Sequence, residues 1–221
     1  MPQRSVVAVG ASLLVASLAL AGCGTRGDSG DNASGSGSSE NKVAKIGVIA
    51  PLSGDLAALG LGIKNSVDLA IKQANDSKAI PGWTLELAAE DDEAKPDVGK
   101  NAATKLAADK DVVGVVGTLN SSVAQSVQPV LASAKITMVS PANTNPSLTQ
   151  GADFATAPAR TYPNYFRTCT TDSIQGPFAA RYLFEKAGIK EVATVNDKKT
   201  YGQGLVNAFT EEYTKLGGKI P

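Results

Sequence analysis

From residue 43 onward, short apolar runs rich in β-branched residues alternate with segments whose apolar residues recur at helical spacing. The first such run, Val43–Ile49, predicts a strand, and the spacing of apolar residues from Ile63 to Ala74 predicts a helix after it. This alternation constrains the fold most strongly because it continues along the rest of the sequence. The predicted strands are 43–49, 83–89, 112–116, 135–139, 165–167 and 191–195, and the predicted helices are 63–74, 98–108, 121–133, 174–187 and 202–216.

Strands that alternate with helices predict a parallel sheet, because parallel neighbours need long crossover connections. The fold class is therefore α/β, doubly wound, with helices covering both faces of the sheet. In such folds ligands bind at the carboxyl ends of the strands, where loops and helix N-termini meet. The residues that directly follow each predicted strand are the candidates for a binding site.

The composition excludes several classes of function. The chain has 221 residues with 21 basic and 21 acidic side chains, so no electrostatic attraction to nucleic acid is expected. It has no histidine, which rules out Ser-His-Asp and Cys-His catalysis within this sequence. Only Cys23 and Cys169 could supply sulfur ligands, so we expect no metal site and no cofactor.

The first residues read as a secretory signal peptide, 1–22, with a basic start, the apolar run Val6–Leu20 and small residues after it. The apolar run is shorter than the roughly 20 residues that a helix needs to cross a bilayer. A short membrane anchor or a buried helix is the alternative. Leu20–Cys23 is similar to a bacterial lipobox, which implies that Cys23 is acylated and anchors the protein to the outer face of the cell membrane.

Residues 23–42 are mainly Gly, Ser, Asp, Asn and Thr, and such a composition predicts a flexible tether. The tether would hold an extracytoplasmic domain within about 25 Å of the membrane surface, so we expect a partner at the membrane. Because Cys23 is assigned to lipid, Cys169 is expected to be a small, partly buried apolar residue with no disulfide.

Hydroxyl side chains follow two of the predicted strands. Ser121 opens a helix after the third strand, where it could cap the helix or help bind a carboxylate together with free backbone amides. Thr144 follows the fourth strand, either as a turn residue or as a ligand contact. Asp91 and Asp92 follow the second strand and are expected to be solvated loop charges rather than a catalytic pair.

Seven short motifs occur in one order between residue 43 and the last residue. They are Ala50–Gly54, Asp91–Asp92, Gly117–Ser122, Pro141–Thr144, Phe166–Thr168, Asp172–Pro177 and Asp197–Gly202. In this order they resemble the leucine/isoleucine/valine-binding proteins of branched-chain amino acid importers. The resemblance implies two doubly wound lobes that close on an amino acid, with 43–168 as the first lobe and 169–221 as the start of a truncated second lobe.

The resemblance also implies the binding residues. Ser121 and Thr144 would bind the α-carboxylate of the amino acid, and the Ala142 carbonyl and Thr144 hydroxyl would receive the α-ammonium. Asp172 would lie at the hinge side of the cleft, and Tyr201 would close over the ligand from the second lobe. Buried charged groups need complete hydrogen bonding, whereas an aliphatic side chain needs only an apolar pocket.

The sequence departs from the family pattern at several positions. Leu59 stands where well-known members carry a tyrosine, and Ala94 and Asn120 replace the cysteines of a disulfide in the first lobe. The carboxylate that the second lobe supplies to the α-ammonium would lie beyond Pro221. We therefore expect the 221-residue product alone to bind weakly or to misfold, because half a lobe leaves apolar sheet uncovered.

The predicted function is that of an extracytoplasmic, monomeric binding protein, not an enzyme, which delivers a branched-chain or related amino acid to an ABC importer permease. A receptor for amides, urea or other small polar solutes on the same fold is the alternative. An enzyme such as a secreted α/β-hydrolase is disfavoured, because the sequence has neither histidine nor a G-x-S-x-G motif.

Overall fold

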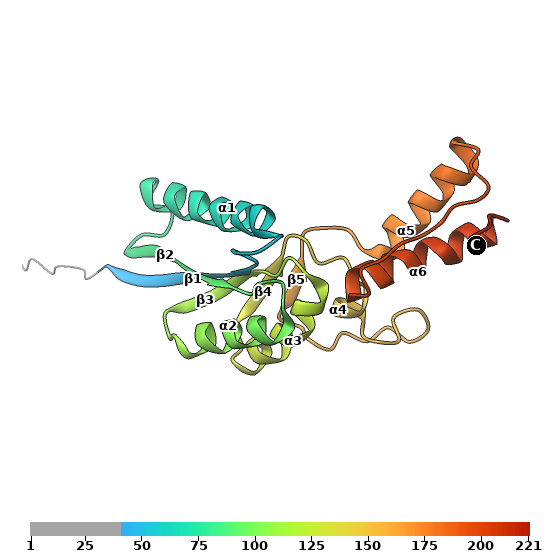
Figure 1. Ribbon diagram of the computed structural model, residues 1–221. Coiled ribbons are helices and arrows are strands. Elements are labelled where there is room, and N and C mark those ends of the chain that lie inside the picture. Colours follow the sequence, from blue (N-terminus) through green and yellow to red (C-terminus); the bar gives the residue numbers. More distant parts are fainter. Residues whose placement is uncertain (1–40) are drawn as a thin grey trace, which may run out of the picture. The chain divides into compact units, whose positions relative to one another are not determined.

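The computed structural model describes residues 41–221, whose central element is a five-stranded sheet (Figure 1). All neighbouring strands are parallel, and their order is β2-β1-β3-β4-β5. The predicted α/β class with a parallel sheet is confirmed. The strands are β1 (Lys42–Ala50), β2 (Trp83–Asp91), β3 (Val112–Gly117), β4 (Thr137–Ser140) and β5 (Tyr165–Arg167).

Helices cover both faces of this sheet. Figure 1 shows α1 on one face and α2 and α3 on the other. The remaining helices follow the last two strands, and α5 and α6 pack against each other. The helices are α1 (Ala57–Asp76), α2 (Pro96–Ala108), α3 (Ser121–Ser133), α4 (Ser147–Gln150), α5 (Asp172–Arg181), the π-helical turn η1 (Tyr182–Lys186) and α6 (Thr200–Lys215).

The hydrophobic core lies on the face that α2 and α3 cover. Val123 and Val127 of α3 and Leu106 of α2 are fully or almost fully buried, and they pack against apolar residues from the sheet. These residues recur at helical spacing, so each helix presents one apolar stripe to the strands. The core holds the helix that begins at Ser121 firmly against the sheet.

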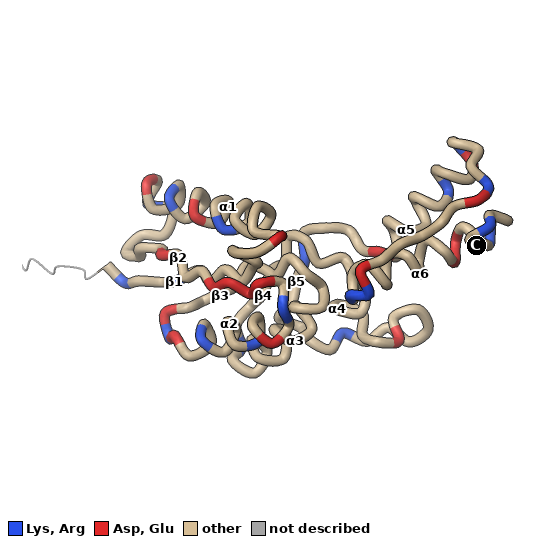
Figure 2. Tube along the Cα trace, in the orientation of Figure 1, with Lys and Arg blue, Asp and Glu red and all other residues tan. Residues whose placement is uncertain are grey.

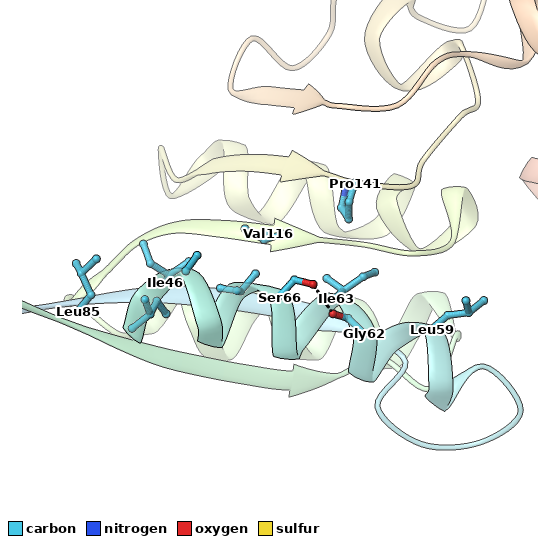
Figure 3. A pocket seen from close by; sticks show the side chains of 11 residues that line it. Ile46, Leu59, Gly62, Ile63, Ser66, Leu85, Val116 and Pro141 are labelled. Atoms are coloured by element: carbon cyan, nitrogen blue, oxygen red, sulfur yellow. Dashed lines mark hydrogen bonds between the residues drawn. The ribbon is translucent and has the colours of Figure 1, made fainter. Parts of the chain in front are cut away.

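The opposite face is less completely covered. Between α1 and the strands lies an open groove of about 660 Å³ with an almost wholly apolar lining, which includes Ile46, Ile63, Leu85 and Val116 (Figure 3). Leu59, at the first turn of α1, also lines the groove and is 58% exposed. Within residues 41–221 no further element covers this groove.

Two glycines of α1, Gly60 and Gly62, provide a direct test of how closely the helix packs against Pro51. A Cβ on Gly60 would overlap the carbonyl of Pro51, whereas a Cβ on Gly62 would meet nothing within 4 Å. Gly60→Ala is therefore expected to lower the free energy of unfolding by about 2 to 3 kcal/mol through overpacking. Gly62→Ala is expected to raise it by about 0.5 to 1 kcal/mol, because alanine favours the helix. Urea titration of both variants measures the two changes in the free energy of unfolding. Equal changes would contradict the close packing of Gly60 on Pro51.

The predicted strand 191–195 is wrong. The segment forms only a single bridge, Glu191 to Lys219, and Val195 is 90% exposed. An extended segment needs a neighbouring strand to satisfy its backbone groups, and among the described residues none pairs along it. Other boundaries differ by a few residues: β4 begins at Thr137 rather than residue 135, because Lys135 has a φ of 59° and belongs to a turn.

The predicted signal peptide and nearly all of the predicted tether lie outside the described residues, as does Cys23. Across residues 41–221 no helix is both long enough and apolar enough to cross a membrane. Basic and acidic side chains are interspersed along this part of the chain (Figure 2).

Candidate ligand-binding site

A buried hydrogen-bond network joins β5 to the segments that follow β3 and β4, and Asn143 is its centre. Its side-chain Oδ1 accepts a hydrogen bond from the Tyr165 hydroxyl of β5 at 3.0 Å. Its Nδ2 donates to the carbonyl of Leu119, after β3, at 3.0 Å. Asn143 is fully buried. The segments that carry Ser121 and Thr144 are thus tied together by one side chain.

The turn after β4 is fixed by Ser140, the last residue of that strand. Its hydroxyl donates to the carbonyl of Thr118 at 2.9 Å and accepts from the backbone amides of Ala142 and Asn143 at 3.2 and 2.9 Å. A hydroxyl that accepts bonds from the following backbone stabilises a tight turn. Ser140 therefore sets the path of the chain through Ala142, one of the predicted binding residues.

Arg167, the last residue of β5, holds the loop on both sides of Thr144. Its guanidinium donates to the carbonyls of Asn143 and Asn145 at 2.6 and 3.0 Å and to the Thr149 hydroxyl at 2.9 Å. Charge-assisted bonds of this kind are stronger than neutral ones. Thr144 lies between two carbonyls that the same cation fixes, so its backbone has little freedom to move.

Ser121 is the first residue of α3 and is 1% exposed. It does not cap the helix, because the N-cap residue is Asn120 and no side-chain capping bond forms. That alternative for Ser121 is therefore wrong. The hydroxyl instead lies at the positive end of a helix dipole, an environment that favours a negative ligand group.

Thr144 and Asp172 lie side by side. The Asp172 amide donates to the Thr144 carbonyl at 2.9 Å, which joins the loop after β4 to the start of α5. The Asp172 carboxyl group is completely buried. Burial raises the pKa of Asp172, and the charge of the Arg167 guanidinium offsets part of this effect.

Polar side-chain atoms that lack a partner concentrate at this place. Within the described residues, five of the six buried side-chain atoms without a hydrogen bond belong to the last residue of β5 or to the segments after β3, β4 and β5. Buried polar atoms are normally paired, so a cluster of unpaired ones indicates a site for a polar ligand. The five atoms are Asn120 Oδ1, Thr144 Oγ1, Arg167 Nε, Asp172 Oδ1 and Asp172 Oδ2.

Tyr201, the fifth predicted binding residue, is the second residue of α6 and is 41% exposed. The structure does not place the Tyr201 side chain against the other four predicted binding residues. Its neighbour Thr200 is held by the first part of the chain, since the Thr200 carbonyl accepts a hydrogen bond from Asn145 Nδ2 at 3.1 Å. The start of α6 therefore lies next to the loop that carries Thr144.

Two cavities flank this site rather than enclose it. The apolar groove beside α1 includes Leu59 and Pro141, the residue before Ala142. A second cavity of about 820 Å³ lies among α4, α5 and α6, and Asp172 is the one predicted binding residue in its lining. The predicted residues thus share a hydrogen-bonded framework, and none of Ser121, Ala142, Thr144 and Tyr201 lines either cavity.

Asp91 and Asp92 are not the solvated loop charges that were expected. Asp92 is completely buried, and Asp91 accepts hydrogen bonds from the backbone amides of Leu52 and Glu93, both at 2.8 Å. Burial raises the pKa of Asp92 to about 6, while a hydrogen bond from the Ala94 amide lowers it and the Asp91 charge raises it further. The pair closes the loop after β2 and has a structural role.

Sequence reasoning gave no role to Ser140, Asn143 or Arg167, although these residues build the framework. Ser140 and Arg167 each end a strand, and Asn143 follows Ser140 within the same turn. A polar residue at the end of an otherwise apolar strand was the available signal. In residues 41–221 no cluster of three or more His, Cys, Asp or Glu could hold a metal ion, and Cys169 is a free thiol.

Comparison with known proteins gives a consistent result. A model of the periplasmic binding protein family matches residues 43–221. A Leu/Ile/Val-binding protein of Rhizobium johnstonii is 40% identical over 164 residues, which cover 74% of this chain and 42% of that protein. The chain therefore spans less than half the length of this relative.

Two solved structures show the same arrangement of elements. A leucine-binding protein from Thermotoga maritima matches with a TM-score of 0.69 and 28% identity, over 80% of this chain and 47% of that one. A solute-binding protein of an ABC transporter from R. palustris, solved with benzoate, matches with a TM-score of 0.70 and 26% identity, over 80% and 46%. Proteins of this fold thus bind both aliphatic and aromatic ligands.

Proposed function

We propose that this chain, which belongs to the periplasmic binding protein family, captures a branched-chain or related amino acid outside the cytoplasm and delivers it to an ABC importer permease. The observation that carries the proposal is the cluster of unpaired buried polar atoms around Thr144 and Asp172. An amino acid brings one carboxylate and one ammonium group, and the cluster offers partners for both.

The carboxylate of the ligand is assigned to the start of α3. Ser121 supplies a hydroxyl donor there, and the helix dipole favours the negative charge. The Thr144 hydroxyl and backbone contribute from the loop after β4, which Arg167 and Asn143 hold in place. This arrangement recognises a carboxylate without any basic side chain in direct contact.

The ammonium group is assigned to oxygen atoms. The Ala142 carbonyl and the Thr144 hydroxyl receive it, and the Asp172 carboxylate lies on the hinge side with both oxygens unpaired. A bound ammonium would favour the charged form of Asp172 and so oppose the effect of burial on its pKa. Tyr201, in the first turn of α6, covers the ligand when the two lobes close, a hinge motion driven by the ligand's additional contacts in the closed state.

The protein works outside the cytoplasm, at the outer face of the cell membrane. Residues 1–22 direct export, Cys23 is acylated, and residues 23–42 tether lobes 43–168 and 169–221 to the outer membrane face as a monomer. The protein is a carrier rather than an enzyme. The family match supports an extracytoplasmic location for the folded part.

The test is thermal unfolding of the natural protein with a panel of ligands. Leucine, isoleucine or valine at about 100 times the dissociation constant should stabilise the protein by about 2.7 kcal/mol and raise its midpoint by roughly 5 to 10 °C. If only amides or urea raise the midpoint, the protein is a receptor for those solutes. If only benzoates raise it, the ammonium site assigned to Asp172 is wrong, and if nothing does, the proposed function fails.

Two substitutions locate the site. Ser121→Ala and Thr144→Val each remove a hydroxyl that would contact a charged ligand group, so each should weaken binding by about tenfold to a hundredfold. Ser122→Ala is the matched control, because Ser122 is the next residue of the same helix and has no assigned contact. Isothermal titration calorimetry measures all three. Equal effects of Ser121→Ala and Ser122→Ala would remove α3 from the binding site.

A further inference from the structure

We propose that Asn145 and Gln125 form a seat on which the first turn of α6 packs through Thr200 and Gly204, and that this seat positions Tyr201 over the ligand. The inference rests on the proposed function, in which Tyr201 closes the site. Tyr201 follows directly after Thr200, the first residue of α6, and Thr200 makes the hydrogen bonds that define the seat. Asn145, Gln125 and Gly204 are positioning residues and need not touch the ligand.

Asn145 has its side-chain amide fixed in one orientation. Its Oδ1 accepts hydrogen bonds from the Ser147 amide at 3.0 Å and the Ser147 hydroxyl at 2.7 Å. These two donors leave the Nδ2 group directed at α6, where it donates to the Thr200 carbonyl at 3.1 Å. Asn145 is 7% exposed, so little water competes for this bond.

Gln125 provides the second contact from a different element. The Thr200 hydroxyl donates to Gln125 Oε1 at 3.0 Å. Gln125 lies on α3, the helix that begins with Ser121, so one rigid helix carries both a proposed ligand contact and a contact to α6. This bond is solvent-exposed and contributes less than the part-buried Asn145 bond.

Gly204 allows the helix to approach this closely. A Cβ at this position would lie 2.5 Å from Asn145 Nδ2 and 3.0 Å from Asp172 Oδ2. Gly204 therefore packs directly on the seat, one helical turn after Thr200. Any larger residue would push the first turn of α6, and with it Tyr201, away from Asp172 and Thr144.

A double-mutant cycle on ligand affinity separates positioning from general stability. Asn145→Ala is expected to weaken leucine binding to the natural protein by about tenfold. In a Tyr201→Ala background the same change is expected to cost less than about twofold, because the residue that the seat positions has gone. Asn207→Ala is the matched control on α6, because Asn207 is exposed one turn further along the helix. The proposal would be overturned if Asn145→Ala weakened leucine binding equally in the wild-type and the Tyr201→Ala proteins.

Hydrogen exchange of the ligand-free protein tests the seat independently of any ligand. Asn145→Ala and Gly204→Ala should each speed exchange of the hydrogen-bonded Gln203 amide, in the first turn of α6, by about tenfold and leave α3 unchanged. Unchanged exchange at Gln203 would overturn the seat. If the wild-type protein binds no amino acid, the proposed function fails, and the exchange result alone then decides whether the seat exists.

Discussion

Replacing Arg167 by methionine is expected to lower the free energy of unfolding by about 3 kcal/mol or more, because it removes a charged donor from three part-buried acceptors. The carbonyls of Asn143 and Asn145 would lose bonds of 2.6 and 3.0 Å, and the Thr149 hydroxyl would lose one of 2.9 Å. Methionine keeps the volume of the side chain, so the effect reports hydrogen bonding rather than a cavity. Urea unfolding followed by circular dichroism measures it.

Two companion variants make this prediction specific. Arg167→Lys keeps the charge but loses the planar fork, and it should recover only part of the stability. Arg181→Met breaks a partly exposed ion pair with Glu212, and it should cost less than about 1 kcal/mol. If Arg167→Met costs no more than Arg181→Met, the loop around Thr144 is not held by this cation. Ligand affinity should fall together with stability only for the Arg167 variants.

Asp92→Asn is expected to stabilise the protein at pH 7 by up to about 3 kcal/mol and to have little effect near pH 4. Asp92 is completely buried, one of its oxygens has no partner, and burial raises its pKa from 3.8 to about 6. The native state therefore binds more protons than the unfolded state between these two values. Stability falls as the pH rises through this window, and asparagine removes that loss.

The neighbouring carboxylate should behave in the opposite way. Burial raises the pKa of Asp91, but hydrogen bonds from Ser53 and from the amides of Glu93 and Leu52 outweigh it, so the pKa is lowered overall. The charged form of Asp91 stabilises the native state above its unfolded pKa, and this contribution is lost as the pH falls. Asp91→Asn should therefore destabilise the protein at pH 7. Denaturation at several pH values compares the two variants, and pH profiles of the same sign would refute the assignment.

The fold could be predicted from sequence wherever local pattern and tertiary environment agree. The span 121–133 was predicted as the structure has it, because apolar residues such as Val123 and Val127 recur on the one face that packs on the sheet. The segment 191–195 failed because its β-branched residues signal a strand, while a strand also needs a neighbour to pair with. The β-propensity of a segment depends on its own residues, whereas strand pairing depends on a neighbour that can lie far away in the sequence.

The site was predictable in outline only. Strand ends could be located from the sequence, so the segments of Ser121, Thr144 and Asp172 were expected to meet, and hydrogen bonds do join them. The role of Asn143 was not predictable, because its partners Leu119 and Tyr165 are more than twenty positions away in either direction. The burial of Asp92 was missed for a similar reason: an acidic residue beside other acidic residues looks solvated until the packing around it is known.

The position of Asn143 limits how a protein with this fold can change its ligand during evolution. Its side chain is both part of the folded interior and the tie between the segments that carry the proposed carboxylate and ammonium contacts. A substitution that re-aimed those contacts would also disrupt the interior, so selection for a new cargo cannot easily act there. Leu59, by contrast, is 58% exposed at the edge of the apolar groove and can change without such damage. New cargoes should therefore arise through exposed positions such as Leu59, while the contacts proposed for the segments that Asn143 ties together change less readily.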